Sequence, residues 1–131
     1  IEFIDTEILT EEMSDVKDWI RDFVRSYEKE VGELYYFFCS DEYLYKMNID
    51  LLGHDFYTDI ITFPLNECEE ILSAEFHISV DRVRENAVTF ERSFEDELHR
   101  VMAHGVLHLI QRHQHQAYGT VTANKSPDAI I

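Results

Sequence analysis

The helical segment from Leu98 to Ile110 is the feature that most constrains how this chain can fold. Apolar residues fall on nearly every side of its helical wheel. A helix that is apolar all round has to be covered by its neighbours, so we expect a central helix. His104 and His108 enter this apolar environment, where an imidazole is costly unless it is hydrogen-bonded or bound to a metal. The segment is therefore both the expected core element and the first candidate for chemistry.

The spacing of His104 and His108 is that of a metal-binding helix. Four residues are about one helical turn, a rise of ~6 Å, with both side chains on one face. The H-E-x-x-H zinc helices present two imidazoles to one ion in this way. Gly105 occupies the position where those helices carry a glutamate base. The pair thus indicates a metal site that is not an ordinary metalloprotease site; the alternative is two core histidines with satisfied hydrogen bonds.

Hydrophobic periodicity and capping residues predict the other elements, with Ser40 and Ser93 expected to cap the second and fourth helices. The expected order is β-α-β-α-β-β-α-α, which indicates an α+β fold with a small mixed β-sheet packed with helices. The strands are expected near residues 1–5, 34–39, 58–63 and 72–80, and the helices near 16–27, 41–52, 81–87 and 94–110. The aromatic run at 34–39 is suited to a strand that is buried on both faces.

Composition favours one globular domain but argues against a broad nucleic-acid surface. A chain of 131 residues that is 45% hydrophobic can bury its own core. The net charge of −16 has the wrong sign for a protein that binds a polyanion over a wide surface. Such a partner would have to meet a local basic spot, a metal ion or a partner protein. Residues 111–131 hold one acid, Asp128, of the 27 in the chain, so we expect one domain at 1–110 and a divergent or disordered tail of that domain at 111–131.

Three sequence blocks resemble those of the YbeY-type metal-dependent endoribonucleases of bacteria. His104–Leu109 matches the first half of that family's signature, H-G-x-L-H-L-x-G-Y-D-H. Thr58–Pro64 resembles its T-D-V-L-S-F-P block, and Ala74–Ser79 resembles its G-D-I-x-I-S block. The resemblance covers about residues 30–110. It implies a zincin-like domain that hydrolyses single-stranded RNA during ribosomal RNA processing and ribosome maturation, with small ribosomal subunit proteins as partners.

The resemblance also implies a third metal ligand, and there the chain departs from the family pattern. The family's ligand falls six residues after the second histidine, which here is Gln114, flanked by His113 and His115. We therefore expect one Zn²⁺ ion on His104 and His108, with His113 or His115 as third ligand. If neither reaches the ion, two ligands hold it weakly. The family's arginine before the T-D block is replaced by Leu52.

Two carboxylates are candidate catalytic residues. Asp59 lies in a family block and could orient a ligand histidine through its other ring nitrogen, although a role as a strand cap is equally compatible with its position. Glu97 lies seven residues before His104, two turns away on the same face. The alternative for Glu97 is a first-turn acid that the helix dipole favours.

Other polar residues have simpler expectations. Arg84 and Arg100 could contact phosphate or could pair with neighbouring acids. His77 and His99 are expected at the surface. Cys39 and Cys68 form no motif, which favours a reducing, cytoplasmic compartment, and no run approaches the length of a membrane span.

Three functions remain open from the sequence. The first is a metal-dependent endoribonuclease, which is an enzyme that hydrolyses phosphodiester bonds. The second is a zinc hydrolase of another class, such as a protease, against which Gly105 counts. The third is a catalytically impaired, ribosome-associated binding protein, which the altered ligand region keeps open.

Overall fold

The computed structural model describes residues 1–9 and 15–117, with side chains described up to Arg112. The elements follow the predicted order, with one short 3-10 helix, η1, added after the first strand. They are β1 (Glu2–Ile4), η1 (Thr6–Ile8), α1 (Val16–Arg25), β2 (Glu30–Cys39), α2 (Asp41–Leu52), β3 (Ile60–Pro64), β4 (Ile71–Ser79), α3 (Val80–Thr89) and α4 (Phe94–Ala117).

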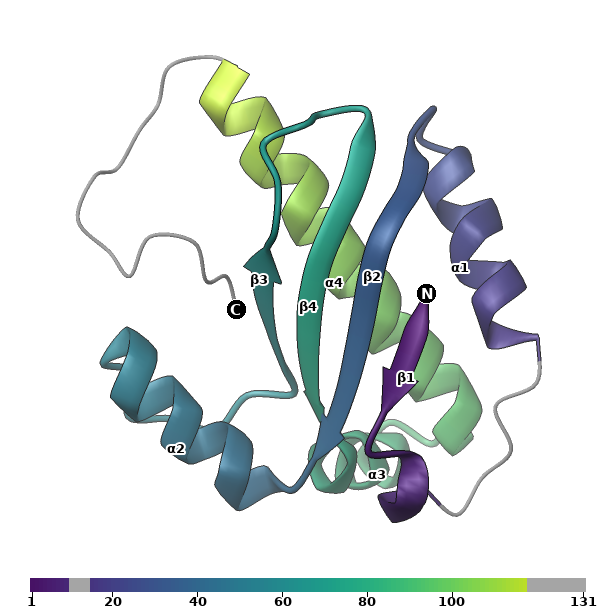
Figure 1. Ribbon diagram of the computed structural model, residues 1–131. Helices are drawn as coiled ribbons and strands as arrows, with labels where there is room; N and C mark the ends of the chain where they lie inside the picture. Colours follow the sequence, from purple (N-terminus) through teal and green to yellow (C-terminus); the bar gives the residue numbers. More distant parts are fainter. Residues whose placement is uncertain (10–14, 118–131) are drawn as a thin grey trace.

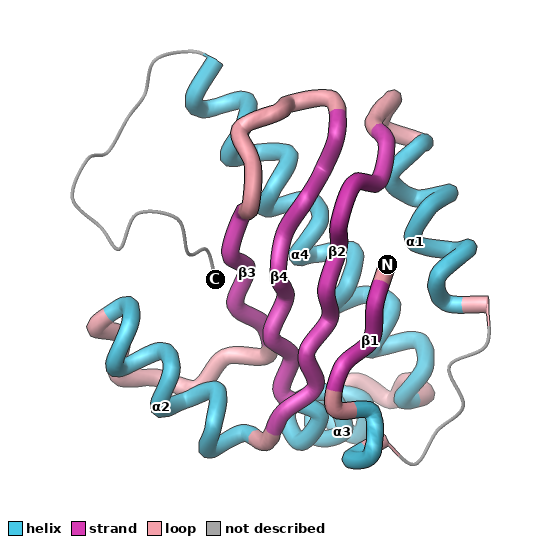
Figure 2. Tube along the Cα trace, in the orientation of Figure 1, coloured by secondary structure: helices cyan, strands magenta, loops and turns pink. Residues whose placement is uncertain are grey.

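The four strands form one mixed sheet in the order β1-β2-β4-β3 (Figures 1 and 2). β2 pairs in parallel with β1 and with β4, whereas β3 pairs antiparallel with β4 and forms one edge. The predicted α+β class with a small mixed sheet is therefore confirmed. β3 is the edge strand that brings Asp59, the residue before it, close to the last helix.

The core lies between the sheet and the helices α1 and α4, which contact each other. In Figure 1, α4 crosses behind the sheet and α1 lies to the right of it, beside β1 and β2. Alternate residues of β2 and β4 point into this core, as the period of two along a strand requires. The fully buried members of this set are Leu34, Tyr36, Phe38, Leu72, Ala74, Phe76 and Ile78. The prediction that 34–39 is buried on both faces is wrong, because Tyr35, Phe37 and Cys39 are only half-buried.

The prediction of a central helix is confirmed for one side of α4. Its apolar side is buried in the core through Leu98, Val101, Met102, Val106, Leu109 and Ile110. The opposite side is open, and His104 is exposed there. The helix is therefore covered by the sheet, α1 and α3, but its open side is not covered by described residues.

At Gly105, α4 lies close against the sheet. A Cβ atom built at this position would lie 2.7 Å from Ile60 Cδ1 and 2.8 Å from Phe76 Cδ1. Real side chains do not tolerate such distances, so the backbone packs directly on β3 and β4 only because residue 105 has no side chain. The glycine therefore sets how close to the sheet α4 carries His104 and His108.

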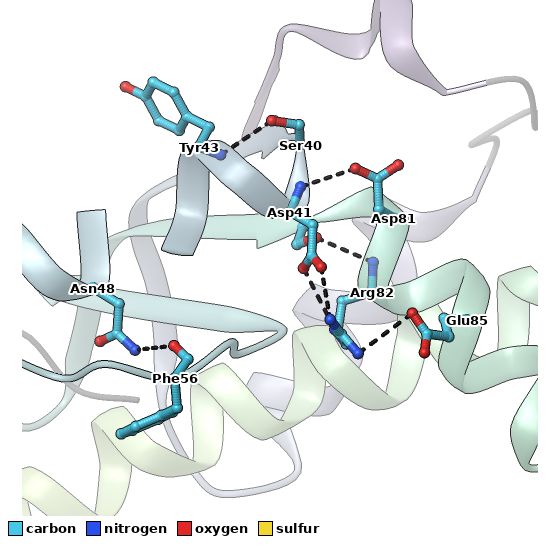
Figure 3. A network of polar contacts seen from close by, with 9 residues as sticks. Ser40, Asp41, Tyr43, Asn48, Phe56, Asp81, Arg82 and Glu85 are labelled. Carbon is cyan, nitrogen blue, oxygen red and sulfur yellow. Dashed lines mark hydrogen bonds and ion pairs between the residues drawn. The ribbon is translucent and has the colours of Figure 1, made fainter. Parts of the chain in front are cut away.

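A cluster of hydrogen bonds joins the end of β4 to the starts of α2 and α3 (Figure 3). Asp41 accepts hydrogen bonds from Ser79 Oγ at 3.0 Å and from Arg82 Nη2 at 2.6 Å. The Asp41 backbone N–H donates to Asp81 Oδ2 at 2.9 Å. We call Asp41, Ser79, Asp81 and Arg82 the Arg82 cluster.

The last helix is longer than the sequence pattern indicates. Ser93 Oγ accepts from the Asp96 N–H at 3.0 Å, which confirms the predicted cap. The helix then continues to Ala117, seven residues beyond the expected end at Ile110. The part of the proposed tail at 118–131 lies outside the described residues, and the division at residue 110 stays a prediction. Among the helices of the described ranges, none is both long and apolar enough to cross a membrane.

Candidate functional site

His104 and His108 lie together on the open side of α4, as their spacing predicts. Their ring centroids are 4.1 Å apart and the ring planes meet at 61°. His104 is exposed, whereas His108 is half-buried. The two imidazoles are close enough to share one ligand.

His108 carries a buried nitrogen that the described part of the protein leaves unsatisfied. Its Nδ1 is buried and has no hydrogen-bond partner among the described residues. Burial, and then the neighbouring His104, lower the pKa of His108, while the charge of Asp59 acts in the opposite direction. The neutral imidazole is the form that ligates metals, so this environment favours a ligand role over that of a satisfied core histidine.

The third metal ligand is not described by the structure. The side chains of His113 and His115 lie outside the described residues, and no group of three His, Cys, Asp or Glu residues that could hold a metal exists within the described ranges. At 1.5 Å per residue, a continuous helix carries these two positions about 7–10 Å beyond His108 along its axis. A third ligand from either position therefore requires the chain to leave the helix before residue 113.

The predicted carboxylates Asp59 and Glu97 are brought together by Arg100. Glu97 is fully buried, and its carboxylate accepts from Arg100 Nε at 3.0 and 3.1 Å and from Arg100 Nη2 at 2.6 Å. Arg100 Nη2 also lies 3.5 Å from Asp59 Oδ2, and Arg92 Nη1 lies 3.4 Å from Glu97 Oε1. The bond to Glu97 is the main cause that raises the pKa of Arg100 above its ordinary value, so the guanidinium stays charged.

Local structure explains this arrangement. The cap at Ser93 starts α4 so that Glu97 falls in its first turn, three residues before Arg100. The carbonyl of Asp59 accepts from the Ser79 N–H at 3.0 Å, which anchors Asp59 at the start of β3. We call Asp59, Glu97, Arg100, His104 and His108 the α4 site.

Comparison with known proteins identifies the family. The family model described as "Endoribonuclease YbeY" matches residues 2–119. The chain belongs to the endoribonuclease YbeY family. A relative from Cytophaga hutchinsonii is 44% identical over 105 residues, which is 80% of this chain and 73% of that protein. Another from Flavobacterium johnsoniae is 46% identical over 104 residues, or 79% and 74% of the two chains, and both are named endoribonuclease YbeY.

A solved structure confirms the fold class. The chain is similar to the solution structure of TM1509 from Thermotoga maritima, with a TM-score of 0.62 and 28% sequence identity. The similarity covers 84% of this chain and 72% of the other. The resemblance read from the three sequence blocks is thus confirmed as YbeY family membership, and the match reaches well beyond residues 30–110.

Several sequence expectations outside the α4 site meet a different outcome. Arg84 lies away from the histidines, where its Nη2 donates to the Ile8 carbonyl at 3.2 Å. The expectation that His77 and His99 are surface residues is met only in part, because both are half-buried. His77 stacks on Phe37 with centroids 4.6 Å apart, and His99 stacks on Trp19 at the same distance.

Strand register and helix pairing bring those rings together, and neither can be read from a single segment of sequence. Pairing of Arg100 with a neighbouring acid was one of its two expectations and is confirmed by Glu97, but its second contact, with Asp59, was missed for the same reason. The available signal for the first pairing was the spacing of three residues between Glu97 and Arg100.

Proposed function

We propose that this chain is a metal-dependent endoribonuclease that hydrolyses single-stranded RNA at the α4 site. Membership of the endoribonuclease YbeY family supports the reaction class. The observation that carries the assignment to this place is the buried, unpartnered Nδ1 of His108 beside the ring of His104. We extend the proposal to ribosomal RNA as substrate, small ribosomal subunit proteins as partners and a cytoplasmic location, all of which the family resemblance implies.

Zinc is the proposed metal, held by His104 and His108. A third ligand at His113 or His115 would require α4, which continues to Ala117 here, to end before residue 113 when the ion binds. Two adjacent imidazoles and an unsatisfied ring nitrogen fit this ion, because zinc prefers nitrogen and sulfur ligands. When bound, zinc supplies a water of pKa near ~7 and a positive charge beside the substrate phosphate.

The carboxylates of the α4 site have separate proposed roles. Asp59 is partly exposed, and its negative charge acts on His108, so it can orient that ring and hold a proton released during hydrolysis. Glu97 is fully buried and paired with two arginines, and it is therefore a positioning residue that meets no substrate. Burial therefore separates two carboxylates that the sequence indicated as catalytic candidates together.

The protease alternative is disfavoured by the packing of Gly105. A helix-borne glutamate base would need a side chain where a single Cβ already lies under 3 Å from Ile60 and Phe76. A catalytically impaired binding protein is a second candidate, and the observation in its favour is that α4 continues unbroken through residues 113 and 115.

Zinc content and RNA cleavage together test the proposal. We expect untagged protein to bind zinc, and His108→Ala to lower both the zinc affinity and the cleavage of a single-stranded RNA oligonucleotide. His77→Gln removes an imidazole from the face of β4 opposite to the one that packs on α4, where it stacks on Phe37, and serves as a matched control. Equal cleavage by wild type and His108→Ala would overturn the proposal. Protein that lacks zinc and activity but still binds ribosomal RNA would support the second candidate.

A further inference from the structure

We propose that Arg100 binds a phosphate group of the RNA strand in the α4 site and that buried Glu97 positions its guanidinium for this contact. The inference rests on the proposed function and adds to it a residue for recognising substrate. It would make Arg100 the local cation that a chain of net charge −16 needs if it is to accept a polyanion.

The guanidinium of Arg100 is held on one side and open on the other. Glu97 engages Nε and Nη2 through three contacts between 2.6 and 3.1 Å. Among the residues whose side chains the structure describes (1–9 and 15–112), none makes a hydrogen bond or ion pair with Nη1, and the Arg100 side chain is 40% exposed. A guanidinium fixed by a buried carboxylate has already lost its side-chain freedom, so a ligand that binds the open edge does not have to order it.

The position of Arg100 matches that of the histidine pair. Residues 100, 104 and 108 follow each other at intervals of four along one strip of α4, with a rise of ~6 Å per interval. A phosphate group next to His104 is therefore within one helical turn of the arginine. Guanidinium groups bind phosphate oxygens through paired, charge-assisted hydrogen bonds.

The acids around Arg100 do not give its surroundings a net negative charge that would repel an anion. Glu97 is shared between Arg100 and Arg92, so its negative charge does not cancel either arginine alone. The second acid, Asp59, makes only one contact with Arg100, at 3.5 Å. The two arginines and two acids are together neutral, in contrast with the strong negative charge of the whole chain.

The experiment measures the affinity of zinc-free protein for a fluorescent single-stranded RNA oligonucleotide at several salt concentrations. For Arg100→Gln we expect an affinity about tenfold lower, because a hydrogen bond to a charged group is lost. We also expect the slope of log K against log salt to fall by about 0.7, the value of one phosphate contact on a single strand. Arg100→Lys should keep the slope and lose part of the affinity. Arg21→Gln removes an exposed arginine on α1 and should change neither.

A second variant guards against loss of folding. Arg100→Gln leaves Glu97 with Arg92 alone, so the double variant Glu97→Gln/Arg100→Gln removes the buried charge as well and should fold like wild type. Unchanged affinity and slope in both variants would overturn the role of Arg100, as would wild-type protein that binds no RNA.

The outcomes also separate this inference from the nuclease assignment. If cleavage depends on His108 but the variants of Arg100 bind and cleave like wild type, only the phosphate site fails. If Arg100→Gln weakens binding while wild type shows no cleavage, the nuclease assignment fails and the phosphate site holds.

Discussion

The Arg82 cluster and the α4 site each contain an arginine paired with carboxylates, but the two arginines differ in how fully their nitrogens are paired. In the Arg82 cluster, all three guanidinium nitrogens face a carboxylate: Nε and Nη2 contact Asp41 at 3.4 and 2.6 Å, and Nη1 contacts Glu85 at 3.4 Å. The side chain of Arg82 is 25% exposed, and its guanidinium lies over the ring of Tyr57. In the α4 site, Arg100 is 40% exposed and keeps one nitrogen without a partner among the described residues.

The difference follows from where the partners come from. Asp41 begins α2 and Ser79 ends β4, so the Arg82 cluster ties together elements that are distant in sequence. The main partner of Arg100 is Glu97, one turn away on its own helix, and its link to another element is the long contact with Asp59. We therefore expect changes in the Arg82 cluster to affect the free energy of unfolding, and changes in the α4 site to affect activity.

The largest expected effect is loss of activity in His108→Ala. Removing a partner that only orients a metal ligand costs about 10–100-fold, so removing the ligand itself should cost more than about 100-fold in kcat/KM. The free energy of unfolding should change little or rise, because the substitution removes a buried nitrogen without a partner. Cleavage assays and urea denaturation on the same preparations check both halves. If His108→Ala lost stability as strongly as activity, the α4 site would no longer differ from the Arg82 cluster in this respect.

Gly105→Ala tests how strongly the geometry of the α4 site depends on packing. The added Cβ would lie 2.7–2.9 Å from Ile60 and Phe76, so α4 must move away from the sheet. Overpacking of this kind costs about 1–3 kcal/mol in the free energy of unfolding. Because the shift moves the flanking histidines relative to Asp59, we also expect weaker zinc binding, measured by competition with a chelator. A variant as stable as wild type would show that the core yields without strain.

Asp41→Asn tests the Arg82 cluster. The amide keeps the shape of the carboxylate but loses the charge that Arg82 Nη2 meets at 2.6 Å, so we expect about 1–2 kcal/mol less stability. RNA cleavage at a temperature where the variant is folded should equal that of wild type. Thermal unfolding and a cleavage assay measure the two effects. A fall in kcat for the folded variant would place this cluster within the functional part of the molecule.

Local patterns were sufficient to predict the elements and the histidine pair. The alternation of Leu72, Ala74, Phe76 and Ile78 predicted β4, and the serine caps predicted where α2 and α4 begin. The spacing of His104 and His108 fixed their proximity because both lie on one helix. In each case the cause is a short-range periodicity that the sequence displays directly.

Contacts between distant segments could not be predicted in the same way. Burial of Glu97 depends on Arg100 and Arg92 folding over it, and the sequence shows only three nearby charges. The resemblance blocks suggested Asp59, but its approach to Arg100 depends on β3 pairing at the sheet edge next to α4. The role of Gly105 as a close-packing position was also hidden, because the sequence shows only that a glutamate is absent.

The smallest expected effect is a change in the pH dependence of stability in His77→Gln. It tests whether a histidine with a lowered pKa outside the α4 site affects stability alone. Burial lowers the pKa of His77 below its ordinary value of 6.5, and Glu75, 3.5 Å away, opposes this only in part. Between the folded-state pKa and 6.5, the unfolded chain binds a proton at this ring that the folded protein does not, so stability falls as the pH decreases through that range. His77→Gln should therefore lose less stability than wild type between pH 7 and pH 5, measured by urea denaturation. RNA cleavage by His77→Gln at pH 7 should be unchanged. Half-buried His77 shares the lowered pKa of His108, but it lies outside the α4 site and has neither an unpartnered buried nitrogen nor a neighbouring imidazole among the described residues. An equal pH dependence in variant and wild type would show that His77 titrates alike in the folded and unfolded states.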